Sequence, residues 1–144
     1  MKRNVLLMLA MVLVLFLAAC GRTADAKTAV TASENLAAGD LNLPDAVAVN
    51  TVADIIDRDD VVLIDVREQY EYDEAHIPGV TLIPLGTVPQ NLDKIPTDKT
   101  VILTCRSGNR SGQATEFLRQ NGYDNVHNMS GGINAWKAAG LTVE

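Results

Sequence analysis

The residues of this chain best suited to chemistry are the six from Cys105 to Arg110, Cys-Arg-Ser-Gly-Asn-Arg. They lie between an apolar run over 100–104 and a helical pattern that begins near Ser111. The cysteine is therefore predicted to end a buried strand and to face a helix N-terminus. The free N–H groups and aligned peptide dipoles of a first helical turn favour negative charge, and Arg106 and Arg110 add positive potential. These effects favour the thiolate, which is the nucleophilic form of cysteine.

Three further motifs accompany this cysteine loop. They are Asp65-Val66-Arg67-Glu68 with Glu71-Tyr72, His76-Ile77-Pro78-Gly79-Val80, and Gly131-Gly132-Ile133-Asn134-Ala135-Trp136. In this order, and together with the loop, they resemble the motifs of the rhodanese family, the sulfurtransferase-like α/β domains. The resemblance covers roughly residues 47–144. One departure is Ala75, where the family often has glycine before the His-Ile-Pro-Gly turn.

Hydrophobic periodicity predicts strands that alternate with helices along this domain. The predicted strands are 46–50, 61–64, 81–83, 100–104 and 125–129, and the predicted helices are 51–58, 68–74, 88–95, 111–121 and a short final one bearing Ile133 and Trp136. Thr51 and Asp54 resemble a capping box for the first helix. The alternation indicates an α/β fold, an open parallel sheet with helices on both faces. The family resemblance implies five strands in the spatial order 3-2-4-5-1.

Two strand ends are predicted to meet at the site. Ligands of open parallel sheets bind beyond the carboxyl ends of the strands. Cys105 and Asp65 each follow a predicted strand at that edge, so we expect them to lie near each other. Asp65 and Arg67 are predicted to form an internal brace that bonds loop N–H groups and a nearby carboxylate such as Glu71.

The resemblance implies transfer of a sulfane sulfur through a covalent intermediate on Cys105. The thiolate attacks the outer sulfur of a small anion such as thiosulfate, sulfite leaves, and the resulting persulfide passes its outer sulfur to cyanide or a thiol. No metal and no cofactor is expected, and a thiolate that already exists needs no general base. His76 is therefore expected to have a structural hydrogen-bonding role, His127 a surface position and Trp136 a place in the core.

The loop itself is predicted to hold the anion. Gly108 permits the backbone angles that turn consecutive N–H groups inward. The side chains of Arg106 and Arg110 are expected to attract a dianion, the alternative being surface arginines paired with acidic neighbours such as Glu116. The backbone N–H groups would cradle the persulfide or the leaving group. The predicted substrate-binding set is Arg106, Ser107, Gly108, Asn109, Arg110 and Ser111.

Loop length separates this chain from related phosphatases. Its second arginine follows the cysteine with the spacing Cys-x4-Arg, and the residue six places after the cysteine is Ser111. The phosphatase loops have the spacing Cys-x5-Arg, which makes a wider cradle for a tetrahedral phosphate. A phosphatase or an arsenate reductase is therefore less favoured than a sulfurtransferase. A non-catalytic alternative stays open, in which the domain is a persulfide carrier without turnover or a module that binds a partner protein.

The first residues predict export and a lipid anchor. Lys2 and Arg3 precede an apolar stretch over 5–19 that has the length of a signal peptide and is short for a membrane-spanning helix. The segment Leu17-Ala18-Ala19-Cys20 resembles the bacterial lipobox. This implies a lipoprotein signal peptide over 1–19 that is cleaved, and lipidation of Cys20. The expected location is extracytoplasmic, on the cell membrane or the outer membrane.

After the signal, the mature chain is predicted to be a small acidic domain on a tether. Residues 20–46 are poor in large apolar groups and are predicted to be a flexible tether, followed by the domain at 47–144. The whole chain has 12 basic and 18 acidic residues, and loss of Lys2 and Arg3 leaves 10 and 18, a change in net charge from −6 to −8. This charge argues against nucleic acid as a partner. The expected partners are a small sulfur anion, a thiol or cyanide acceptor, and the membrane, and the domain is expected to be monomeric.

Overall fold

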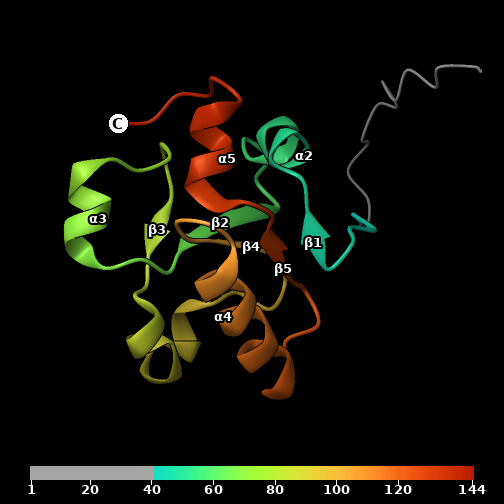
Figure 1. Ribbon diagram of the computed structural model, residues 1–144. Helices are drawn as coiled ribbons and strands as arrows, with labels where there is room; N and C mark the ends of the chain where they lie inside the picture. Colours follow the sequence, from blue (N-terminus) through green and yellow to red (C-terminus); the bar gives the residue numbers. More distant parts are fainter. Residues whose placement is uncertain (1–40) are drawn as a thin grey trace, which may run out of the picture. The chain divides into compact units, whose positions relative to one another are not determined.

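The sheet at the centre of the domain is open, parallel and five-stranded (Figure 1). The computed structural model describes residues 41–144. The strands are β1 (Ala46–Val47), β2 (Val61–Asp65), β3 (Thr81–Leu82), β4 (Thr100–Thr104) and β5 (Val126–Met129), and they lie in the order β1-β5-β4-β2-β3. Taken from the other edge this order is 3-2-4-5-1, so the predicted fold class and strand order are confirmed.

The predictions for the start of the chain fall largely outside the described residues. The signal peptide at 1–19, the lipidation of Cys20 and most of the tether at 20–46 stay predictions. Within the described part, Leu41 is buried and Leu43 packs against the same apolar cluster. The last residues of the predicted tether therefore pack on the domain. No helix between residues 41 and 144 is both long enough and apolar enough to span a bilayer.

Strands β2 and β4 lie in the middle of the sheet, because their unbroken runs of apolar residues suit burial on both faces. Their register runs from Val61 opposite Thr100 to Asp65 opposite Thr104. Both strands therefore end at the same edge of the sheet. Cys105 directly follows Thr104, so its backbone leaves the sheet beside Asp65, as the alternation of strands and helices predicts.

Helices cover both faces of the sheet, with α2 and α5 on one side and α4 on the other (Figure 1). On the first face, α2 (Val49–Ile55) and α5 (Gly132–Ala138) pack in one apolar cluster with Ile102 of β4. On the second face, α4 (Asn109–Gln120) packs in another cluster with Leu103. Successive strand residues point to opposite faces, so β4 contributes to both cores and is held firmly in place.

The helix predicted over 88–95 is wrong in type. The segment forms two 3₁₀ helices, η1 (Leu85–Gln90) and η2 (Leu92–Lys94), with Pro89 inside the first. Proline has no N–H to donate and disfavours a continuous α-helix around it. The segment therefore follows tighter turns on its way from β3 to β4.

The predicted capping box at Thr51 is also wrong. Because β1 is only two residues long, the chain enters α2 before Thr51, with Ala48 as the N-cap and no side-chain cap. A capping box forms instead at α3 (Gln69–Glu74), the helix between β2 and β3. There the Glu68 side chain accepts from the backbone of Glu71, and the Glu71 side chain accepts from the backbone of Glu68. This places Glu71 in the first turn of a helix beside the site.

Candidate active site

Cys105 lies at the carboxyl end of β4, in the turn that leads into α4. It is 1% exposed, and it is the only free cysteine within residues 41–144. Its Sγ atom accepts hydrogen bonds from the Gly108 N–H at 3.2 Å and from the Ser111 hydroxyl at 3.4 Å. Gly108 is the N-cap of α4 and has a φ of +94°, a conformation that favours glycine. The turn thus aims a backbone donor at the sulfur.

These surroundings lower the pKa of Cys105 from its ordinary value of 9.0. Burial is the largest single influence and raises the pKa. Hydrogen bonds from the Ser111 hydroxyl and from the backbone of Ser111, Ser107 and Gly108 lower it, and together they outweigh burial. The donors stabilise a charged sulfur that burial alone would disfavour. A buried thiol with a raised thiolate fraction, ringed by N–H groups, is suited to act as a nucleophile.

The first residues of α5 hold the backbone of the cysteine loop in place. The Ile133 N–H donates to the Cys105 carbonyl at 2.8 Å, and the Asn134 N–H donates to the Arg106 carbonyl at 3.1 Å. Gly132 approaches so closely that a Cβ atom there would lie 2.2 Å from the Cys105 carbonyl oxygen and 2.7 Å from the Arg106 carbonyl carbon. The Gly-Gly pair is visible in the sequence as a motif. Its contact with the loop depends on a segment far along the chain and was missed.

Arg110 is paired with a carboxylate of α3. Its guanidinium donates to both carboxylate oxygens of Glu71, at 2.6 and 2.7 Å. These hydrogen bonds lower the pKa of Glu71 to about 2 and raise the pKa of Arg110. The expected alternative partner, Glu116, instead accepts from Gln120 on the surface of α4. The arginine closest to the helix start is therefore neutralised by a residue 39 positions away in the sequence.

Arg106 lies on the solvent-exposed side of the cysteine loop. It is exposed and makes no ion pair within the described part of the chain. Its side chain lines a hollow of about 310 Å³, shared with Tyr70 and Glu71 of α3 and with Asn134 and Lys137 of α5. Tyr70 is 71% exposed, the most exposed large apolar side chain described. The hollow borders the cysteine loop at Arg106, and its lining carries both signs of charge.

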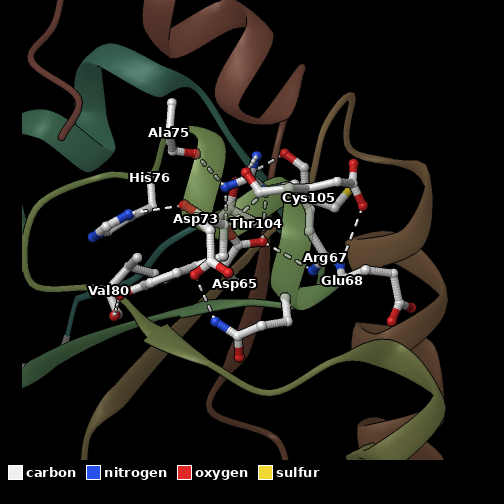
Figure 2. Close-up of polar contacts among 12 residues, drawn as sticks. Asp65, Arg67, Glu68, Asp73, Ala75, His76, Val80, Thr104 and Cys105 are labelled. Atoms are coloured by element: carbon white, nitrogen blue, oxygen red, sulfur yellow. Dashed lines mark hydrogen bonds and ion pairs between the residues drawn. The ribbon is translucent and has the colours of Figure 1, made fainter.

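Asp65 and Arg67 form a buried pair at the end of β2, and Figure 2 shows the arginine between Asp65 and Ala75. The carboxylate accepts from the Arg67 N–H at 2.9 Å and from its Nε at 2.8 and 3.0 Å. The guanidinium also donates to the carbonyls of Glu71 at 3.1 Å and Ala75 at 2.8 Å. The expected bond to the Glu71 carboxylate is wrong, because that carboxylate is taken by Arg110. The pair ties both ends of α3 to the sheet and so orients Glu71.

Ser111 and Asn128 form a polar contact that was missed. Ser111 is fully buried in the first turn of α4, and its hydroxyl lies 2.6 Å from Oδ1 of Asn128 on β5. Nδ2 of Asn128 donates to the Gly108 carbonyl at 3.1 Å. Asn128 lies opposite Leu103 of β4 in the parallel register, which brings it beside the loop. No local pattern in the sequence distinguishes it from a surface asparagine.

The two histidines make structural contacts. The Nδ1 atom of His76 lies 3.0 Å from the Tyr72 carbonyl, its ring stacks on that of Tyr72, and its backbone pairs with Glu144. His127 contacts the Pro44 carbonyl at 2.9 Å. Trp136 is 5% exposed and packs in the core, as predicted.

The opposite edge of the sheet carries a larger hollow of about 670 Å³. It lies where strands begin, and its lining includes Leu41, Thr100, Asn125 and His127. None of its lining residues is a nucleophile of the type expected from the sequence, so the smaller hollow at Arg106 is the relevant one. Between residues 41 and 144, no cluster of His, Cys, Asp and Glu side chains is arranged to hold a metal ion.

The structure is an open parallel α/β sheet, and at the carboxyl end of its central strand, where ligands of such sheets bind, it holds a cysteine whose sulfur accepts hydrogen bonds from the following helix start. The sequence profile of the rhodanese-like domain matches residues 48–139, and the chain belongs to this family. It is 40% identical over 89 residues to a sulfurtransferase of Allochromatium vinosum, a match that covers 62% of this chain and 83% of that protein.

Other relatives agree with this assignment. Thiosulfate sulfurtransferase GlpE of Pseudoalteromonas translucida is 29% identical over 93 residues, covering 65% of this chain and 89% of GlpE. A crystal structure of a rhodanese-related protein from Thermoplasma volcanium superimposes with a TM-score of 0.65 at 29% identity, covering 70% of this chain and 98% of that one. In several further relatives the match spans only 20–59% of their length, so similar domains also occur inside longer proteins.

Proposed function

We propose that this protein is a sulfurtransferase that carries a sulfane sulfur as a persulfide on Cys105. One observation carries the proposal: the buried Cys105 sulfur receives hydrogen bonds from the Gly108 N–H and the Ser111 hydroxyl at the start of a helix. The hydrogen-bond donors stabilise the thiolate form of this sulfur, and burial shields it from solvent. The sulfurtransferases among the relatives support this assignment.

In the first step, the Cys105 thiolate attacks the outer sulfur of a donor such as thiosulfate. A new S–S bond forms to Cys105, the S–S bond of thiosulfate breaks, and sulfite leaves with that electron pair. Arg106 on the open side of the loop attracts the dianion and its leaving group. The backbone N–H groups of the loop stabilise the negative charge of the outer persulfide sulfur.

In the second step, a thiophilic acceptor attacks the outer sulfur of the persulfide. The bond between the two sulfurs breaks, and the electron pair returns to Cys105 as a thiolate. Cyanide would leave as thiocyanate, and a thiolate would leave as a new persulfide. No proton has to be removed by a base in either step when the acceptor is already an anion.

The geometry favours sulfur over phosphate as the transferred group. A phosphate cradle needs an arginine fork that is free to bind oxygens. Here the fork of Arg110 is filled by Glu71 at 2.6 and 2.7 Å, and the Gly108 N–H donates to the Cys105 sulfur at 3.2 Å. A phosphatase or arsenate reductase role is therefore not proposed.

We also propose that residues 1–19 act as a lipoprotein signal, which would direct this activity outside the cytoplasm. We infer that Cys20 is lipidated after removal of residues 1–19, because of the Leu-Ala-Ala-Cys sequence. The domain would then act at a membrane surface as a monomer. The donor and acceptor would be small sulfur compounds or protein thiols available in that compartment.

Steady-state turnover tests the proposal. The chain is mixed with excess thiosulfate and cyanide, and thiocyanate is measured beside the Cys105→Ser variant. Many equivalents of thiocyanate from the parent and none from the variant are expected. A single equivalent would indicate a carrier without turnover, and equal output from both chains would contradict a role for Cys105.

A further inference from the structure

The hydroxyl of Ser111 lies between two acceptors and has only one proton to give. Asn128 Oδ1 is 2.6 Å away and the Cys105 sulfur is 3.4 Å away. A hydroxyl has one O–H donor and two lone pairs, so it serves one of these acceptors well at a time. The state of the sulfur and the orientation of this hydroxyl are therefore linked.

The orientation of the Asn128 amide is fixed by its other contact. The Gly108 carbonyl can only accept, so the amide NH₂ group must face it at 3.1 Å. This leaves Oδ1 facing Ser111, and Oδ1 can also only accept. Asn128 therefore competes directly with the sulfur of Cys105 for the Ser111 proton. The same carbonyl accepts from the Gly112 N–H at 2.9 Å, so it keeps a partner when the asparagine is replaced.

We propose that Asn128 is a positioning residue for the transfer reaction. When the Cys105 sulfur is neutral, the Asn128 amide oxygen accepts the hydrogen bond from the Ser111 hydroxyl. When the sulfur is charged, the amide oxygen competes with the sulfur for that hydrogen bond. In the thiol, the S–H donates to Ser111 Oγ, which donates to Asn128. In the thiolate, the hydroxyl turns to the sulfur and Asn128 Oδ1 loses its donor.

The consequence for catalysis rests on the proposed function. In the persulfide the inner sulfur is neutral, so the Ser111 proton returns to Asn128. When the acceptor removes the outer sulfur, Cys105 becomes a thiolate again and the hydroxyl turns back to it. Asn128 therefore stabilises the persulfide relative to the free thiolate, and it makes the loaded form longer-lived.

Several charged side chains near Cys105 also influence the charge state of its sulfur. Arg106 and Arg110 come from the cysteine loop and α4, Glu71 from α3, and Lys137 from α5, while Asp65 and Arg67 pair at the end of β2. Arg110 interacts electrostatically with Cys105 and is itself held by Glu71. Within residues 41–144, none of these side chains forms a hydrogen bond or ion pair with Asn128 or the Ser111 hydroxyl, so replacing Asn128 by an apolar residue removes none of their pairings.

The test is the pKa of the Cys105 thiol, measured from the rate of alkylation by iodoacetamide as a function of pH. The full chain carries Cys20→Ser throughout, so that Cys105 is its only thiol. Ser111→Ala removes the donor and is expected to raise the pKa by about one unit or more, given the strength of a hydrogen bond to a charged group. Asn128→Leu removes the competitor and is expected to lower the pKa by about half a unit to one unit.

The double variant isolates the coupling. If Asn128 acts through Ser111, adding Asn128→Leu to Ser111→Ala changes the pKa no further. Asn121→Leu at the far end of α4 makes the same substitution away from the sulfur and is expected to leave the pKa unchanged. Asn128→Val, which suits a strand, carries the same expectation as the leucine variant if that one does not fold.

Two results would overturn the proposal. One is a raised pKa in Asn128→Leu, which loosening of the Gly108 turn would produce. The other is the same lowering with and without Ser111. Alkylation needs no sulfur donor, so the coupling can hold even if thiosulfate turnover fails, and the two claims fail separately.

Discussion

The contact between Gly132 and the cysteine loop gives the sharpest mutational test of the site. In Gly132→Ala, the new Cβ atom would lie 2.2 Å from the Cys105 carbonyl oxygen and 2.7 Å from the Arg106 carbonyl carbon. Both are backbone atoms, so the loop itself has to move. Reaching an ordinary contact of 3.4 Å needs 3.4 − 2.2 = 1.2 Å of movement at the oxygen.

The expected cost follows from two effects. Alanine at a φ of +56° costs about 1–2 kcal/mol, and overpacking against the loop costs about 1–3 kcal/mol more. We therefore expect a loss of about 2–5 kcal/mol in the free energy of unfolding. A displacement near 1 Å also breaks the 3.2 Å bond from the Gly108 N–H to the sulfur, and misplacement on this scale reduces turnover by about 100-fold.

Gly140→Ala is the matched control. Gly140 also has a positive φ, of +74°, but a Cβ atom there meets nothing within 4 Å. It should lose only the backbone contribution of about 1–2 kcal/mol, with unchanged turnover per folded molecule. Urea unfolding and thiocyanate formation measure both effects. Equal stability and equal turnover in the two variants would refute the argument that close approach at Gly132 shapes the loop.

Three further predictions concern other parts of the chain. Asp65→Asn leaves the buried Arg67 without its anion, so the free energy of unfolding in urea should fall by about 3–5 kcal/mol. The fraction that still folds should load sulfur as before. Unchanged stability would argue against a bracing role for this pair. The pKa of Glu71 is about 2 in the folded state against an ordinary 4.5, so its bond to Arg110 stabilises the fold above pH 4.5, and this stabilisation is lost as the pH falls toward 2. Glu71→Gln should therefore flatten the dependence of the free energy of unfolding on pH in this range. An unaltered dependence would contradict this assignment. Cys20→Ala should move the protein out of the membrane fraction or block its maturation, whereas unchanged fractionation would exclude a lipid anchor at Cys20.

The central part of the fold could be predicted because its signals are local. The apolar runs of β2 and β4 and the polar, glycine-containing turn after them follow from strand burial and helix-start chemistry. Their parallel pairing then brings Asp65 beside the residue before Cys105. The segment with Pro89 failed because apolar spacing suggests a helix while proline and its neighbours favour 3₁₀ turns.

The contacts that tune the site could not be predicted, because they join distant segments. Glu71 was expected to pair with Arg67, yet it binds Arg110 from 39 residues away. Asn128 reaches the loop only because β5 lies beside β4 in a particular register. Side-chain pairing at a sheet edge depends on the whole topology, and a sequence pattern fixes only which residues are near that edge.

Formation of a persulfide on Cys105 can be read from the intact mass of the chain. The chain with Cys20→Ser is incubated with thiosulfate, and its intact mass is measured by mass spectrometry. The same chain with Cys105→Ser added is measured in parallel. One added sulfur atom is expected on the first chain alone, and it is lost when cyanide is added. No added mass on the parent, or equal added mass on the Cys105→Ser chain, would contradict sulfur transfer from thiosulfate through Cys105.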